Sequence, residues 1–221
     1  MQISITSGKK LLLFVIFFVF VLPSTREISS SQSPSTDVSR EAEKHYQRGS
    51  EEYFAENYIG AYKEYSEAIK CCNKYFWAYL SRGYTLTKIN RLKEAEADFT
   101  KAIDIDPKSV DAYICRGLVR KEIKNYEGGI EDFTQAIKIK PSFPDSYNNR
   151  GILKTKLNDY EGAIQDFSMA LEMDERFGEA YFNRAAAKFN LNEKASACED
   201  WQTAYGLGVK ESKEMIEQHC Q

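Results

Sequence analysis

A period of 34 residues runs through the chain from about residue 42 to residue 211. Six columns of alike residues keep this step in one register: Gly49, Gly83, Gly117, Gly151 and Ala185; Arg48, Arg82, Arg116, Arg150 and Arg184; Ala68, Ala102, Ala136, Ala170 and Ala204; Tyr65, Phe99, Phe133, Phe167 and Trp201; His45, Tyr79, Tyr113, Tyr147 and Tyr181; Ala61, Ala95, Gly129, Ala163 and Ala197. Such regularity predicts copies of one unit that cover each other's apolar surface.

The spacing inside each copy predicts a pair of helices. Tyr79, Arg82 and Gly83 are three and four residues apart, so they share one helical face. A second segment places Ala95 and Phe99 four residues apart, again on one face. The small residues allow close approach, and the aromatic ring fills the space between the helices. Asn residues fall at the turn within each copy, where left-handed conformations are tolerated.

Segments such as YLSRGYTLTKINRLKEAEADFTKAIDIDP (79–107) and YICRGLVRKEIKNYEGGIEDFTQAIKIKP (113–141) resemble tetratricopeptide repeats. The resemblance implies an all-α, right-handed solenoid of helix–turn–helix repeats at 42–75, 76–109, 110–143, 144–177 and 178–210, followed by a capping helix at 211–221. The last repeat and its cap are similar to those of bacterial secreted or envelope members. Pro144 is expected in the first turn of a helix, where proline is tolerated.

The N-terminus has the layout of an export signal. Lys9 and Lys10 precede the apolar run Leu11–Leu22, and Pro23 and Ser24 follow. This layout predicts a signal peptide over 1–24, although an uncleaved membrane anchor is the alternative. The run is short for a bilayer span, which needs about 20 residues. Residues 25–40 are rich in Ser and Thr and are predicted to be a flexible tether. We therefore expect an exported protein of the periplasm, envelope or extracellular space, with membrane contact only through this segment.

Composition argues against nucleic acid and against catalysis. The formal net charge is -3, which gives no clustered positive charge for phosphate binding. The sequence has none of the usual nucleophile, metalloprotease or phosphate-loop motifs. Its two histidines, His45 and His219, fit no structural zinc spacing. We expect a chain that is not an enzyme and that uses no metal or cofactor.

Two sets of residues allow a structural interpretation. An acid stands 16 residues after each repeated Arg: Glu64, Asp98, Asp132, Asp166 and Asp200. An ion pair between the helices of each copy is favoured over a ladder of ligand sites. Cys198 lies on the last second helix and Cys220 ends the cap, so a disulfide between them would tie the cap down. The pairing cannot be deduced from sequence alone, and free thiols are the alternative.

The resemblance implies that the first helices line a concave, ligand-binding face. The residues predicted to form a peptide-binding groove there are Tyr46, Tyr53, Trp77, Ser81, Tyr84, Cys115, Lys121, Asn149 and Asn183. The aromatic rings would anchor apolar side chains, and the asparagines would bind an extended backbone. Alternatively, these rings pack between neighbouring repeats.

The expected function is therefore a non-catalytic protein–protein interaction module, such as an adaptor, scaffold or assembly factor, that binds a protein or peptide. A self-associating structural module and an accessory subunit of an envelope enzyme complex are the alternatives.

Overall fold

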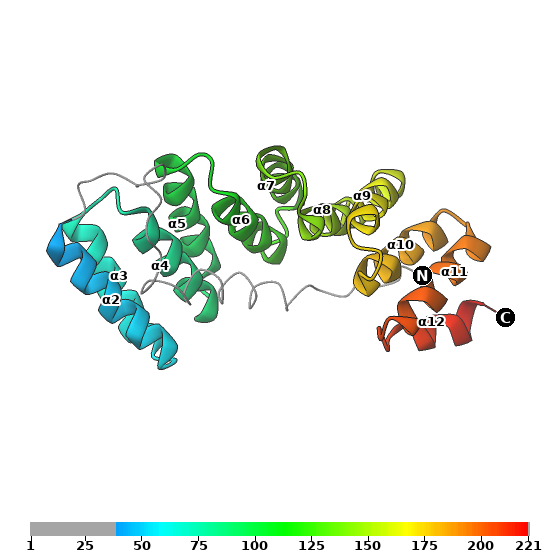
Figure 1. Ribbon diagram of the computed structural model, residues 1–221, viewed down its shortest axis with the longest axis horizontal. Coiled ribbons are helices and arrows are strands. Elements are labelled where there is room, and N and C mark those ends of the chain that lie inside the picture. The colour runs from blue at the N-terminus through cyan, green and yellow to red at the C-terminus, as the bar shows by residue number, and fades with distance from the viewer. Residues whose placement is uncertain (1–38, 221) are drawn as a thin grey trace. The chain divides into compact units, whose positions relative to one another are not determined.

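The computed structural model describes residues 39–220, and every regular element in this range is an α-helix (Figure 1). These residues form two compact units, 39–124 and 125–220, which we call the N-terminal unit and the C-terminal unit. The predicted export segment and most of the predicted tether lie outside the described residues. The all-α fold of successive helix pairs, predicted from the period, is confirmed.

The N-terminal unit holds five helices. They are α2 (Arg40–Phe54), α3 (Tyr58–Cys71), α4 (Phe76–Lys88), α5 (Leu92–Ile105) and α6 (Val110–Glu122). Each helix contacts its sequence neighbours, from α2 on α3 through to α5 on α6. Tyr65, Tyr84 and Phe99 are fully buried between them.

The C-terminal unit continues the pattern with six helices. They are α7 (Tyr126–Ile139), α8 (Pro144–Lys156), α9 (Tyr160–Met173), α10 (Gly178–Asn190), α11 (Lys194–Gly206) and α12 (Ser212–His219). Phe167 and Trp201 are fully buried at the aromatic column. Pro144 opens α8, as expected.

The glycine column sets how closely the two helices of a copy approach. A Cβ atom added to Gly83 would lie 2.7 Å from the Phe99 ring, and one added to Gly151 would lie 2.7 Å from the Phe167 ring. Contacts this short force the ring or the backbone to move. Glycine is therefore required by packing at these two positions.

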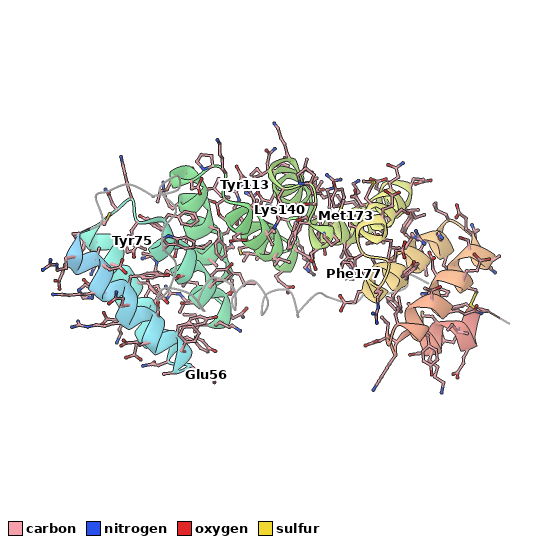
Figure 2. The ribbon with its side chains drawn as sticks, in the orientation of Figure 1. Glu56, Tyr75, Tyr113, Lys140, Met173 and Phe177 are labelled. Atoms are coloured by element: carbon pink, nitrogen blue, oxygen red, sulfur yellow. A yellow bond between two sulfur atoms is a disulfide. The ribbon has the colours of Figure 1, made fainter. Side chains whose placement is uncertain are left out.

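A left-handed residue marks the turn within each copy. Five residues at the 34-residue step have positive φ: Glu56, Asn90, Lys124, Asn158 and Asn192. Figure 2 shows Glu56 at the tip of the hairpin of α2 and α3. Where Glu56 and Lys124 take this position, the neighbouring Asn57 and Asn125 instead cap the next helix through their side-chain oxygens. The predicted turn asparagines thus have two different roles.

The repeated arginines tie helices together, as the structural interpretation predicts. Arg82 donates to both carboxylate oxygens of Asp98 at 2.7 Å, and it also donates to Ser66 Oγ at 3.1 Å. Arg150 and Arg184 repeat this arrangement with Asp166 and Asp200. The hydroxyl comes from the preceding copy and forms a further column that the sequence analysis missed: Ser66, Thr100, Thr134 and Ser168.

The first copy departs from this pattern, and the expected pair of Arg48 with Glu64 is wrong. The Glu64 Oε2 atom lies 2.7 Å from His45 Nδ1 instead. Arg48 is exposed, and within the described residues no ion pair joins it to Glu64. His45 stands where the later copies have a tyrosine, and its ring nitrogen takes the place of the arginine beside this carboxylate.

Helix α2 carries charge where later first helices carry buried residues. Lys44 is exposed, whereas the residues at the same step are buried: Ala78, Ala112, Ser146 and Ala180. Glu51 is likewise exposed, although its counterpart Leu153 is fully buried. The helix also begins earlier than predicted, because the Ser39 side chain accepts a hydrogen bond from Ala42 N at 3.1 Å and caps it. Arg40 is therefore the first residue of the helix, and Ser39 is its N-cap.

Helix α12 closes the other end. Ser212 stands 34 residues after Gly178, so α12 occupies the register of a further first helix, although it is shorter. The structure contains a disulfide between Cys198 and Cys220, with Cα atoms 5.6 Å apart. The ring of His219 lies 4.5 Å from that of Phe189. Met215 and Ile216 pack against the cluster around Trp201, as a capping helix requires.

Candidate protein-interaction surface

The predicted binding residues lie on the first helices of each copy. We call this side of α2, α4 and α6, and separately of α8 and α10, the first-helix face of each unit. In the N-terminal unit, Tyr46 and Trp77 are half-buried. The Tyr46 ring lies 5.2 Å from that of Tyr75, which Figure 2 labels, and the Trp77 ring meets Phe76 edge-on at 4.9 Å. These two rings keep part of their surface accessible.

Other predicted residues of this unit are buried. Tyr84 is fully buried, and its hydroxyl oxygen accepts a hydrogen bond from Cys115 Sγ at 2.8 Å. Burial raises the pKa of the Tyr84 hydroxyl and of the Cys115 thiol well above their ordinary values, so both stay neutral. Ser81 is buried against Tyr46, with its Oγ atom 3.5 Å from the tyrosine oxygen. Tyr53 is also buried, and Lys121 is half-buried.

The asparagines of the C-terminal unit are buried as well. Asn149 Nδ2 donates to the backbone oxygen of Asp145 at 2.9 Å, within α8. Asn183 Nδ2 on α10 donates to Asn148 Oδ1 on α8 at 3.2 Å. The amides therefore link neighbouring first helices to themselves and to each other.

Burial favours the alternative interpretation for the rings of Tyr53 and Tyr84, and four further predicted residues are buried as well: Ser81, Cys115, Asn149 and Asn183. In this conformation they pack within and between copies. Their role in contacting a ligand stays a prediction, and Tyr46, Trp77 and Lys121 are the members with accessible surface. Residue type alone does not separate the two roles, because Tyr84 and Trp77 are both aromatic yet differ in burial.

A column of acids on the same helices was missed. Four of the five positions at this 34-residue step are acidic, namely Glu43, Asp111, Asp145 and Glu179, and Trp77 occupies the remaining one. Glu43 accepts a hydrogen bond from the Tyr75 hydroxyl. Asp145 and Glu179 are half-buried, and neither forms an ion pair within residues 39–220. The 34-residue step was the signal that could have found them.

Two searches of the described residues found nothing. No helix in the range 39–220 is long and apolar enough to cross a membrane. Nor does this range contain a group of three or more His, Cys, Asp and Glu side chains that could hold a metal ion.

Comparison with protein families agrees with the period. Sequence models of the tetratricopeptide repeat match residues 78–109, 110–143 and 144–177. The chain is a tetratricopeptide repeat protein. The matched residues include Tyr84 and Cys115 of the N-terminal unit and Asp145 of the C-terminal unit. Part of the first-helix face of each unit therefore lies within the matched repeats.

Solved structures place this tetratricopeptide repeat protein among proteins of the same fold. It resembles MamA (residues 41 to the end) from Desulfovibrio magneticus RS-1, with a TM-score of 0.74 and 14% identity over 78% of this chain and 98% of that one. It also resembles YrrB, described as a TPR protein with an unusual peptide-binding site, with a TM-score of 0.69 and 16% identity over 76% and 87%. The TPR domain of Arabidopsis OM64 aligns at a TM-score of 0.50 and 28% identity over 52% and 96%. No curated protein matches the sequence.

Proposed function

We propose that this tetratricopeptide repeat protein binds a polypeptide segment on its first-helix face and acts as a non-catalytic adaptor, scaffold or assembly factor. The repeat fold itself supports a protein–protein interaction module. One observation carries the proposal: the scaffold columns repeat from copy to copy, whereas the predicted binding positions on the first helices change from mainly aromatic residues in the N-terminal unit to asparagines in the C-terminal unit. Variation against a constant frame is the arrangement expected of a recognition surface.

The accessible aromatic rings support this proposal. Tyr46 and Trp77 are only half-buried, and each packs against a neighbouring ring that supports it. Rings held in this way provide large contact area at a low entropic cost. The peptide-binding site named for YrrB is a precedent on the same fold, and we extend it to this chain only as part of the proposal.

We also propose that the protein works outside the cytoplasm. The basic and apolar N-terminal segment supports export, and so does the disulfide between Cys198 and Cys220, because such bonds persist in oxidising compartments. Sequencing the N-terminus of the protein isolated from its source would test this part. Retention of Met1 in a protein from the cytoplasmic fraction would refute it.

Site-directed photo-crosslinking tests the binding face. A photoreactive phenylalanine analogue placed at Trp77 should crosslink a partner in the source cell, because this position is accessible on α4. The matched control places the analogue at Lys101, which is exposed on the second helix α5. Stronger partner crosslinking from Lys101 than from Trp77 would place the interface elsewhere.

The mass of the crosslinked product separates the alternatives. A product of twice the chain mass would indicate self-association. We expect a partner of another mass, because the exposed Lys44, Arg48 and Glu51 give α2 a charged outer side that does not favour stacking of a second copy on it.

A further inference from the structure

Two acids on the first-helix face of the C-terminal unit lack a basic partner. Asp145 lies in the first turn of α8 and Glu179 in the first turn of α10, and these two helices contact each other. Neither forms an ion pair with a basic side chain among the described residues. The pKa of the Asp145 carboxyl is raised: burial raises it most, a hydrogen bond from the Asp145 backbone N–H partly offsets this, and the negative charges of Glu179 and Asp174 raise it further. The carboxylates therefore repel one another with no cation between them.

A third polar group on this face is also unsatisfied. Asn183 lies four residues after Glu179, so the two side chains emerge on the same face of α10. Its Nδ2 atom donates to Asn148 Oδ1 across to α8, whereas its Oδ1 atom is buried and accepts no hydrogen bond from the part of the chain that the structure describes. A buried acceptor without a donor is costly. Among the described residues, Asn183 Oδ1 therefore lacks a donor and the two acids lack a basic partner.

The ordinary explanation for acids in a first helical turn is attraction to the positive end of the helix dipole. That explanation suffices for Glu127 and Glu161, which are exposed in the first turns of α7 and α9. Asp145 and Glu179 are half-buried instead, and burial without a basic partner disfavours a charged group. Helix capping alone thus does not account for their position.

We propose that the first-helix face of the C-terminal unit binds a polypeptide segment that carries lysine or arginine. Asp145 and Glu179 accept hydrogen bonds from the cationic side chain, and Asn183 Oδ1 accepts one from the bound segment. Arginine fits this arrangement well, because its planar head presents five donors that bridge two carboxylates. This inference rests on the proposed function and names the chemistry of its partner.

A pair of short peptides tests the inference on the full chain. The probe is a fluorescein-labelled Gly-Ser-Arg-Ser-Gly-Arg-Ser-Gly peptide, and its control is the same peptide with citrulline, a neutral isostere, in place of arginine. Binding is measured by fluorescence anisotropy at low and at near-physiological salt, because a charge contact weakens with ionic strength. We expect the arginine peptide to bind at least about tenfold more tightly than the citrulline peptide.

Two matched double variants locate the contact. D145N/E179Q should reduce affinity for the arginine peptide by about tenfold or more, whereas E161Q/E172Q, which removes two exposed charges from α9, should change it less than about twofold. Circular dichroism checks that both variants remain folded. Equal losses in the two variants would show general charge attraction and overturn the proposal, as would absence of binding by the wild type.

Failure of the proposed selection of basic segments can be distinguished from failure of the proposed polypeptide binding. If the citrulline peptide binds as well as the arginine peptide, the face binds polypeptides but does not select cations. Crosslinking from Trp77 lies in the other unit and does not depend on Asp145 or Glu179. A negative peptide result with a positive Trp77 crosslink would therefore reject only the selection of basic segments.

Discussion

The N-terminal and C-terminal units use one scaffold but fill their first-helix faces differently. In the N-terminal unit, Tyr84 and Cys115 hydrogen-bond each other in the interior, and Glu43 receives the Tyr75 hydroxyl. In the C-terminal unit, Asp145 and Glu179 have no cationic partner among residues 39–220, and in the same range no donor reaches Asn183 Oδ1. The first unit uses these positions for packing, whereas the second leaves them incompletely satisfied. Incomplete satisfaction lowers stability and is characteristic of sites kept for binding.

The largest expected effect is loss of the packed ring in the N-terminal unit. Tyr84→Ala removes a fully buried ring beside Phe99 and Cys115, so it should lower the free energy of unfolding by about 3–5 kcal/mol. Tyr84→Phe keeps the ring and should cost only about 1 kcal/mol. Urea unfolding followed by circular dichroism measures both.

The sequence alone suggests that Tyr84→Ala and Trp77→Ala would both weaken partner binding without unfolding the protein. The structure distinguishes the two variants, because Trp77 is only half-buried. Trp77→Ala should therefore lower the free energy of unfolding less than Tyr84→Ala does. Equal unfolding midpoints for the two alanine variants would contradict this distinction.

The disulfide should stabilise the C-terminal unit alone. It closes 22 residues of sequence, and the double variant C198S/C220S should therefore lower the free energy of unfolding by about 3 kcal/mol. The two tryptophans report separately, since Trp201 lies in the C-terminal unit and Trp77 in the N-terminal unit. In the double variant, the unfolding transition reported by Trp201 should have its midpoint at a lower urea concentration, whereas the midpoint reported by Trp77 should not change.

Cys71→Ser is the control for this variant, because Cys71 is an exposed thiol outside the disulfide. An unchanged Trp201 transition after reduction would show that α12 is held by its apolar contacts alone.

The glycine column tests whether the scaffold is the same in both units. Gly83→Ala and Gly151→Ala each bring a methyl group to 2.7 Å from an aromatic ring, so each should cost about 1–2 kcal/mol after the gain in helix propensity. Gly206→Ala is the control, since nothing lies within 4 Å of the added atom, and it should be neutral or slightly stabilising. If Gly206→Ala lowered the midpoint of thermal unfolding as much as Gly83→Ala and Gly151→Ala do, the packing requirement would be refuted.

The smallest expected effect is a gain in stability. The pKa of Asp145 is raised in the folded chain, so its ionised form opposes folding above that pKa. Asp145→Asn should therefore stabilise the protein by less than about 1 kcal/mol at neutral pH, and the gain should vanish below about pH 4, where the unfolded carboxyl is also protonated. Glu161→Gln, an exposed acid, should show no such gain. A variant less stable than wild type at neutral pH would contradict the repulsion.

The repeat period predicted most of the fold. Columns such as Gly83 and Phe99 are defined by contacts inside one copy, so their residue types are the same wherever the contact recurs. The pairing of Arg82 with Asp98 followed from the same logic, and the first copy broke it because His45 replaces an aromatic residue there. Columns thus predict contacts well until an end of the array is reached.

The candidate surface was predicted less well. Tyr84 and Trp77 are both large aromatic residues on α4, yet one is buried and the other is accessible. Their exposure depends on which neighbour covers them, and a single sequence does not state this. The acids Asp145 and Glu179 were visible in the period, but their lack of partners became apparent only from the contacts around them.

The charged side of α2 and the covalently fastened α12 together bear on how such a chain changes in length during evolution. Lys44 and Glu51 at one terminus, and Cys220 at the other, are suited to the outermost copies and to no interior one. Duplication of a terminal copy would bury charged side chains or leave a cysteine without its disulfide partner. Duplication of an interior copy would preserve every contact. In longer homologous chains we therefore expect the additional copies to be duplicates of interior copies.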